Sequence, residues 1–142
     1  ITAKTSGLSV GGIAGYLWTS LHDKQFVENC YNIGAIEGMD NVGGIAGHFR
    51  YSTMTGCFNY GDTTYGLAGL FDEAEIKNSY YLSGADKKAY FNHNDHDNGA
   101  VVEKPEDNVK GLTEEAFTDL VNFVGFSEAV WEVVNGLYPT LK

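Results

Sequence analysis

A short phrase recurs along this chain, and its recurrence limits the fold more than any other feature. The letters V-G-G-I-A-G stand at 10–15 and again at 42–47, and a shortened form, Y-G-L-A-G, stands at 65–69. A second phrase alternates with the first: N-C-Y-N-I-G at 29–34, G-C-F-N-Y-G at 56–61 and N-S-Y-Y-L-S at 78–83. Repeats of this length are typical of solenoids, in which each unit buries its apolar residues only against its neighbours.

The spacing of the repeat favours strands over helices. Gly44 and Gly66 are 22 residues apart, whereas Gly12 and Gly44 are 32 apart, because two insertions of five residues enlarge the first unit near 17–25 and 35–41. Helical repeats are longer, roughly 33–47 residues. We therefore expect an all-β fold, a short right-handed parallel β-helix with about 22 residues per coil, over residues 1–83. The chain starts within a unit, so we expect its first coil to be truncated.

Equivalent positions of the units predict rows of stacked side chains. The glycines of the first phrase suit close backbone approach or tight corners. The second phrase begins with Asn or Gly in each unit, and this residue predicts a bend, because Asn and Gly adopt left-handed backbone cheaply. That bend turns the following residue inward. The predicted apolar rows are Ile13/Ile45/Leu67 and Val27/Met54/Ile76, and the aromatic row is Tyr31/Phe58/Tyr80. The predicted structural positions are Gly12, Gly44 and Gly66, the bend residues Asn29, Gly56 and Asn78, and the inward residues Cys30, Cys57 and Ser79.

The two cysteines occupy equivalent positions in neighbouring coils. Stacked strands lie about 4.8 Å apart, near the lower limit of the Cα separations that a disulfide spans. A bond between Cys30 and Cys57 would be strained, so we favour free thiols that pack as small apolar side chains. Asn32 and Asn59 are also equivalent. We interpret them as a stacked amide ladder between coils, with sugar binding as the alternative.

Charge and hydropathy exclude two classes of partner. The net charge is −10, which argues against nucleic acid, because phosphate binding requires a basic face. No apolar run approaches the roughly 18–20 residues needed to cross a bilayer. We expect neither nucleic-acid binding nor membrane insertion.

The periodicity ends after residue 83. Residues 84–110 are polar, and we expect a non-repeating loop there. Thr113 is a predicted N-cap, with acidic residues in the following turn, and an apolar stripe predicts a helix over about 113–124. A final strand or hairpin is expected over about 130–141. Residues 111–142 would then form a helix-containing cap, which a solenoid needs to cover its exposed end.

The phrases V-G-G-I-A-G and N-C-Y-N-x-G resemble the GLUG repeat over residues 8–83, and the pattern Trp131…G-L-Y-P-x-L at 131–141 is similar to the tail that follows such arrays. The third unit departs from the pattern, with one glycine and with Ser79 in place of Cys. The resemblance implies a large secreted or cell-surface bacterial protein, of the kind that includes adhesin-like proteins and IgA-specific metallopeptidases. In those peptidases the His-Glu-x-x-His zinc motif lies in a separate domain, and this chain has no such motif.

One segment carries metal-ligand chemistry. His93, Asp95, His96 and Asp97 follow one another closely, and carboxylates such as Asp95 and Asp97 are ligands that Ca²⁺ accepts. The Glu of an EF-hand loop is missing, and a third zinc ligand is not evident. A solvated loop without a cofactor is the favoured interpretation, with Ca²⁺ as the alternative.

Aromatic side chains are the strongest sign of a binding surface. Tyr16, Trp18 and His22 lie in and beside the first insertion, and a nearby row of the next unit supplies Tyr51. Aromatic residues on a solenoid face stack on sugars or anchor a protein partner, whereas aromatic residues of the core do neither.

The sequence as a whole favours a protein that is not an enzyme. We interpret it as a structural or adhesive repeat module of a bacterial extracellular surface protein, which presents or spaces other domains of the same large chain and binds a host or matrix ligand. The alternatives are a glycan-binding module and an accessory, non-catalytic region of a secreted peptidase.

Overall fold

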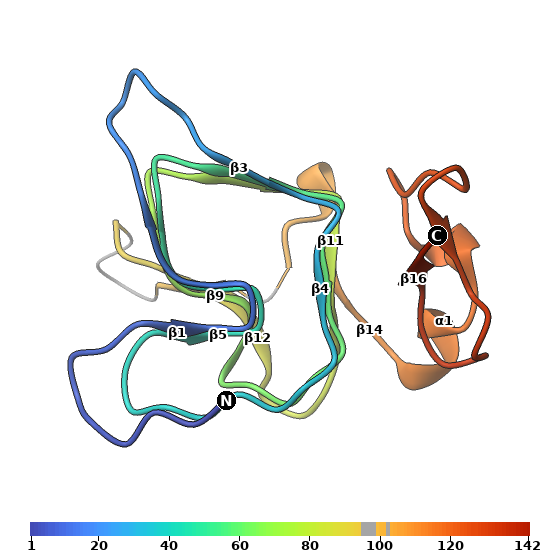
Figure 1. Ribbon diagram of the computed structural model, residues 1–142, viewed down its shortest axis with the longest axis horizontal. Coiled ribbons are helices and arrows are strands. Elements are labelled where there is room, and N and C mark those ends of the chain that lie inside the picture. The colour runs from blue at the N-terminus through green and yellow to red at the C-terminus, as the bar shows by residue number, and fades with distance from the viewer. Residues whose placement is uncertain (95–98, 102) are drawn as a thin grey trace.

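The computed structural model describes residues 1–94, 99–101 and 103–142. Most of its regular structure is β, and its three larger sheets are built mainly from parallel strands (Figure 1). Repeats one, two and three, which we define as residues 10–32, 42–59 and 65–82, overlie one another in this view. Their strands pair at equivalent sequence positions.

Each repeat contributes strands to all three larger sheets. The first sheet contains β1 (Val10–Gly11), β2 (Ala14–Trp18), β5 (Val42–Gly43), β6 (Ala46–Arg50), β9 (Tyr65–Asp72), β12 (Lys88–Asn92) and β13 (Ala100–Val101). The second contains β3 (Phe26–Glu28), β7 (Thr53–Thr55) and β10 (Glu75–Lys77). The third contains β4 (Tyr31–Asn32), β8 (Phe58–Asn59), β11 (Ser79–Leu82) and β14 (Val109–Leu112).

The pairing register confirms the predicted rows. Val27 pairs with Met54 and Met54 with Ile76, and all three side chains are buried. Ile13 and Ile45 lie between strands, but their N–H groups donate to the carbonyls of Ile45 and Leu67. Ile45 and Leu67 are fully buried, whereas Ile13, in the first repeat, is 48% exposed. Parallel strands in register place identical positions one above another, so the repeat in the sequence becomes a stacked core.

The bends also lie where the sequence places them. Asn29, Gly56 and Asn78 all have positive φ, at 52°, 62° and 44°. The residues that follow turn toward the interior: Cys57 and Ser79 are fully buried and Cys30 is half-buried. Both cysteines are free, as expected.

The row of glycines makes room for the amide ladder. A Cβ on Gly12 would lie 2.8 Å from Cγ of Asn32, and one on Gly44 would clash with the amide of Asn59. At Gly66 the clash would be with the ring of Tyr81, which takes the place of the asparagine in the third repeat. These positions need glycine because a side chain of the third sheet fills the space, and not because of an unusual backbone angle.

Residues 84–110 differ from the expected loop. The segment contains β12, which extends the first sheet, the short β13, and a 3-10 helix, η1 (Pro105–Asp107). The register between β12 and β9 shifts twice, and β13 runs antiparallel. Buried Ala89, Tyr90 and Val109 explain why this polar stretch still adds strands: enough apolar side chains remain to pack on the third repeat.

The C-terminal segment packs beside the sheets. Figure 1 shows it next to β4 and β11, and its aromatic side chains cover the aromatic row Tyr31, Phe58 and Tyr80. The expected helix over about 113–124 is divided into α1 (Glu114–Phe117) and η2 (Leu120–Asn122). Thr113 does cap α1, since its Oγ1 accepts a hydrogen bond from the Ala116 N–H. The expected terminal strand or hairpin is a hairpin of β15 (Trp131–Glu132) and β16 (Thr140–Leu141).

The helical elements described here are all short. None of them has the length and apolar character that a membrane-spanning helix requires.

Candidate functional site

Two of the predicted ligand-binding residues share one outward face. Tyr16 and Trp18 lie two residues apart on β2, and they are 55% and 56% exposed. Leu17, between them, packs against the core instead. Since side chains alternate along a strand, the same face of the neighbouring strand β6 presents His48 and Arg50. We call this group, Tyr16, Trp18, His48 and Arg50, the aromatic-cationic face.

Strand register joins these four residues in two pairs. Tyr16 pairs with His48 and Trp18 with Arg50. The ring of Tyr16 meets that of His48 edge-on, with centroids 4.7 Å apart. The next strand adds Leu70 beside His48 and Asp72 beside Arg50.

Asp72 and Tyr51 hold Arg50 in one orientation. The Nε of Arg50 lies 2.8 Å from Oδ2 of Asp72, an ion pair without the alignment of a hydrogen bond, and Asp72 is only 6% exposed. An Nη2–H of Arg50 donates to the Tyr51 hydroxyl at 3.0 Å, and the guanidinium lies 4.6 Å from the centre of the Tyr51 ring. The hydrogen bond with Tyr51, followed by the charge of Asp72, raises the pKa of Arg50, while desolvation opposes this rise.

A second side chain, that of Asn94, also holds the Asp72 carboxylate in place. Its Oδ1 accepts a hydrogen bond of 3.2 Å from the amide of Asn94. A buried carboxylate is costly unless it is paired and hydrogen-bonded, and here it has both kinds of partner. The remaining guanidinium N–H groups of Arg50 are therefore presented next to Trp18 by a rigid support.

His48 is kept neutral by its surroundings. Its Nε2 is covered and accepts or donates no hydrogen bond within the described parts of the chain. Desolvation is the main cause that lowers the pKa of His48, with the charge of Asp72 acting in the opposite direction. A neutral imidazole beneath Tyr16 contributes a flat, weakly polar surface and no positive charge at neutral pH.

The other two predicted residues lie apart from this pair. His22 lies in the exposed turn that joins β2 to β3. Tyr51 follows β6, with a left-handed φ of 50°, and its backbone N–H donates to the Asp72 carbonyl at 3.2 Å. Trp18 and Tyr51 thus lie beside Arg50, Tyr16 lies beside His48, and His22 remains on the turn.

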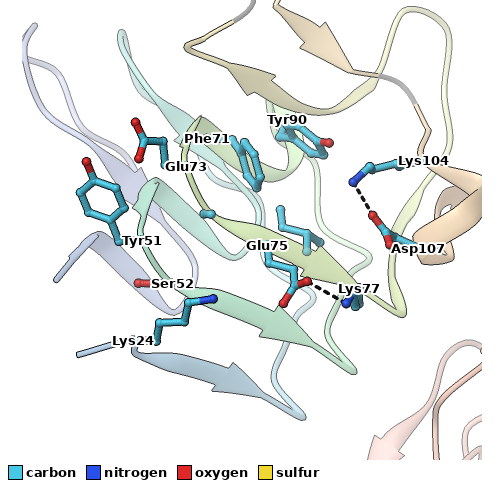
Figure 2. Close-up of a pocket in the computed structure, with 12 residues that line it drawn as sticks. Lys24, Tyr51, Ser52, Phe71, Glu73, Glu75, Lys77, Tyr90, Lys104 and Asp107 are labelled. Carbon is cyan, nitrogen blue, oxygen red and sulfur yellow. Dashed lines mark ion pairs between the residues drawn. The ribbon is translucent and has the colours of Figure 1, made fainter. Parts of the chain in front are cut away.

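Tyr51 also lines a polar groove with a volume of about 360 Å³ (Figure 2). Tyr51 and Glu73 lie at one end, Lys104 and Asp107 at the other, and Phe71 packs beside Tyr90 with ring centroids 4.5 Å apart. The groove follows β10, which is the last strand of the second sheet. The first and third sheets each continue beyond the third repeat, whereas the second sheet does not, and this difference leaves the groove.

The charged side chains of the groove are largely paired with one another. Lys77 lies 2.7 Å from Glu75, and Lys104 forms an ion pair with Asp107. The hydrogen bond from Lys77 to Glu75 raises the pKa of this lysine, and Asp107 does the same for Lys104. Because the charges balance internally, the groove suits an uncharged polar ligand better than an ion.

The predicted metal ligands Asp95 and Asp97 lie outside the described residues. Within the ranges 1–94, 99–101 and 103–142, no group of three or more His, Cys, Asp or Glu side chains is arranged to hold a metal ion.

Sequence reasoning did not identify Arg50 and Asp72 as site residues, although a signal for them exists. Trp18, Arg50 and Asp72 are separated by 32 and 22 residues, which are the spacings of the repeat. The repeat frame therefore placed all three at one position of successive units, where an aromatic residue, a cation and an anion lie side by side.

Comparisons of the chain with protein-family models, with curated proteins and with solved structures gave no match in any of the three.

Proposed function

We propose that this chain is a non-enzymatic structural and adhesive module of a bacterial extracellular surface protein, built as a short right-handed β-solenoid of GLUG-type repeats. The observation that carries the proposal is the register of the repeats. Val10 pairs with Val42, Ala46 with both Ala14 and Ala68, and Phe58 with both Tyr31 and Tyr80. Each unit buries its apolar residues against its neighbours, as a solenoid requires.

A module of this kind spaces or presents other domains of the same large chain. Stacked parallel strands give a stiff body whose length grows with the number of repeats. The net charge of −10 keeps such a body soluble and prevents non-specific association with other acidic surfaces.

The aromatic-cationic face supports a binding role in addition to the structural one. Tyr16 and Trp18 are large, exposed and on one face, and Arg50 is held beside Trp18 by Asp72 and Tyr51. Flat aromatic rings with fixed hydrogen-bond donors next to them suit a saccharide, whose apolar face stacks while its hydroxyl groups accept. A glycan-binding module is therefore the second candidate function.

An adhesion assay tests the binding role directly. The chain is attached to beads, and their retention is measured on immobilised matrix proteins and on a glycan array. We expect Trp18→Ala to reduce retention at least tenfold on the surface that the chain binds. Phe26→Ala is the matched control, because Phe26 is 62% exposed but lies on β3 in the second sheet.

The assay separates the two candidates. Retention on glycans favours the glycan-binding module, and retention on matrix proteins alone favours a protein ligand. If no surface retains the beads, or if Phe26→Ala weakens retention as much as Trp18→Ala, the proposed adhesive role of this face is wrong.

A further inference from the structure

The second sheet ends one strand earlier than its neighbours, and this leaves the edge of β10 in the polar groove. Beyond the third repeat, β12 continues the first sheet and β14 continues the third, whereas β10 pairs only with β7 within the described residues. The ring of Tyr90 and the ion pair of Lys104 and Asp107 line the groove beside this edge (Figure 2). Its volume of about 360 Å³ is within the range of ligand sites.

The hydrogen bonds on either side of β10 show how long the unpaired stretch is. The Phe71 carbonyl accepts the His93 N–H, and the Asn78 N–H donates to the Asp107 carbonyl, both at 2.8 Å. Asn78 is 7 residues after Phe71, whereas Asp107 is 14 residues after His93. Part of that longer segment, β13, turns back along β12. Among the residues that the structure describes, none forms a further strand beside β10 between these two hydrogen bonds.

The unpaired backbone groups of this edge belong to Ile76. The Glu75 N–H donates to the Ser52 carbonyl at 2.9 Å, on the side of β7. Successive residues of a parallel strand direct their N–H and C=O groups to opposite sides, so those of Ile76 point away from β7. The Asn78 N–H, two residues further on, points the same way and is bonded to Asp107. One donor and one acceptor of Ile76 therefore face the groove without a strand to pair with.

A peptide backbone is the ligand that matches these two groups. An N–H and a C=O of one residue, directed to the same side of a strand, are what a neighbouring strand pairs with, and extended peptides add to free sheet edges in this way. The charged side chains that line the groove are largely paired with one another, so a segment with uncharged side chains fits it best. The strand on the other side of β10 is β7, and its sequence, Thr-Met-Thr, is of this kind.

The recessed position of the edge argues against a second copy as the occupant. Two copies would have to bring their β10 edges together, but in each copy the first and third sheets extend past β10. These extensions would meet before the edges did. A single extended segment is narrow enough to enter, because neighbouring strands lie only about 4.8 Å apart.

We propose that the β10 edge binds an extended segment of another protein, with uncharged side chains, which pairs its backbone with the N–H and C=O of Ile76. The bound segment lies in the groove between β12 and β14 and extends the second sheet by one strand. Trp18 does not line the groove, so this binding is additional to that of the aromatic-cationic face.

Amide hydrogen exchange, with peptides selected from a phage-displayed random library on the immobilised chain, tests the site. In the free chain the Ile76 amide should exchange faster than that of Glu75, which is hydrogen-bonded. A selected peptide should slow exchange of Ile76 about tenfold or more. The Glu28 amide is the matched control, because β3 is the opposite edge of the sheet and Glu28 points away from β7, as the bond from Asn29 N–H to the Thr55 carbonyl shows. Its exchange rate should not change.

N-methylation of the selected peptide, one residue at a time, tests the backbone pairing. An N-methyl group removes a donor, and only alternate residues of an added strand face β10. We expect binding to weaken about tenfold at every second position and to persist at the positions between them. Trp18→Ala should bind the peptide as the original chain does, since Trp18 lies outside the groove.

Four results would overturn the inference. A library that yields no peptide able to slow exchange of Ile76 is one, and equal effects of N-methylation at all positions of the peptide are another. Slower exchange of Ile76 at higher concentrations of the chain alone would assign the edge to a second copy. Slower exchange with a glycan in place of the peptide would make the groove a saccharide site. None of these outcomes depends on bead retention, so this inference and the adhesive function fail separately.

Discussion

The indole Nε1 of Trp131 donates a hydrogen bond of 3.4 Å to Oδ1 of Asn29, a residue 102 positions earlier in the chain. Asn29 forms the left-handed bend of the first repeat, and Trp131 is 1% exposed. The same indole packs on Phe126 with ring centroids 4.8 Å apart and on Phe58 at 5.7 Å. The C-terminal hairpin is therefore attached to the first repeat as well as to the later ones.

Removal of this indole should uncouple the C-terminal segment from the repeats. We expect Trp131→Ala to lower the free energy of unfolding by about 3–5 kcal/mol, the usual cost of deleting a buried Trp. Trp18→Ala, at an exposed position, should change it by no more than about 0.5 kcal/mol. Urea unfolding followed by circular dichroism measures both. Equal losses in the two variants would show that the indole does not anchor the hairpin.

The two tryptophans should also differ in their access to solvent. Trp18 is 56% exposed and Trp131 is 1% exposed, so iodide should quench one part of the native fluorescence and leave the other. Trp18→Phe should remove the part that iodide quenches. If both parts resist iodide in the native chain, the aromatic-cationic face is covered, and its proposed binding role loses its basis.

The structure of the repeats was predictable because equivalent positions carry residues of the same type at a constant spacing. The bends at Asn29, Gly56 and Asn78 followed from residue type alone, since few residues adopt positive φ cheaply. The register followed from the spacing, and the thiols and the ladder between Asn32 and Asn59 followed from equivalence. What the pattern could not indicate was which face of the third sheet is covered, because the aromatic row has the same spacing whether it faces inward or outward.

The C-terminal segment was harder to predict because packing overrides its periodicity. The apolar stripe that predicted a helix over 113–124 contains Phe117, which is buried, and Val121, which is 76% exposed. Phe117 and Phe123 must both reach Phe58, at 5.6 and 6.0 Å between ring centroids, and a continuous helix would not place them both on that ring. The amide of Asn122 instead donates to the Ala116 carbonyl, which satisfies the end of α1.

The side-chain amide of Asn59, in the second repeat, should contribute more to the free energy of unfolding than that of Asn32, in the first repeat. Asn59 is fully buried and bonds to Asn32, to both backbone groups of Gly61 and to Thr63. Asn59→Ala leaves several buried polar groups without partners, each of which costs about 1–3 kcal/mol. We expect the variant to lose at least about 2 kcal/mol of unfolding free energy by chemical denaturation. Asn32→Ala, at the open edge, should lose less, and the reverse order would contradict a cooperative ladder.

The paired thiols should react very differently with alkylating reagents. The Cys57 thiol donates to the Thr55 carbonyl at 3.3 Å, and the neighbouring Cys57 side chain lowers the pKa of Cys30 to about 7 although desolvation opposes this. The neighbouring Cys30, together with burial, raises the pKa of Cys57. Because the thiolate is the nucleophile, we expect native iodoacetamide to modify one thiol per chain, with a rate that rises through about pH 7 and levels off above it.

A substitution of Cys57 identifies the source of this reactivity. Cys57→Ala removes the side chain that lowers the pKa of Cys30, so this pKa should return upward and the rate should continue to rise beyond pH 8. Mass spectrometry of the alkylated peptides shows which thiol reacts. Modification of Cys57 first, or a pH profile that Cys57→Ala leaves unchanged, would contradict the coupling between the two thiols.

Gly44 tests whether the repeated glycines are required by close packing. Its φ is not in the left-handed region, yet a Cβ there would clash with the Asn59 amide and with the Gly66 carbonyl, one side chain and one backbone atom of the neighbouring strands. Backbone in a paired sheet cannot yield as a flexible side chain does, so Gly44→Ala should cost at least about 1–3 kcal/mol of unfolding free energy.

Gly84→Ala is the matched control, because a Cβ at Gly84 meets nothing within 4 Å and its φ is also ordinary. There the loss of chain entropy in the unfolded state should leave stability unchanged or raise it by about 0.4–1 kcal/mol. Thermal and urea unfolding of the two variants should therefore shift in opposite directions or by clearly different amounts. If Gly44→Ala is as stable as Gly84→Ala, the glycine row does not make room for the amide ladder, and the close approach of the first and third sheets at this position is wrong.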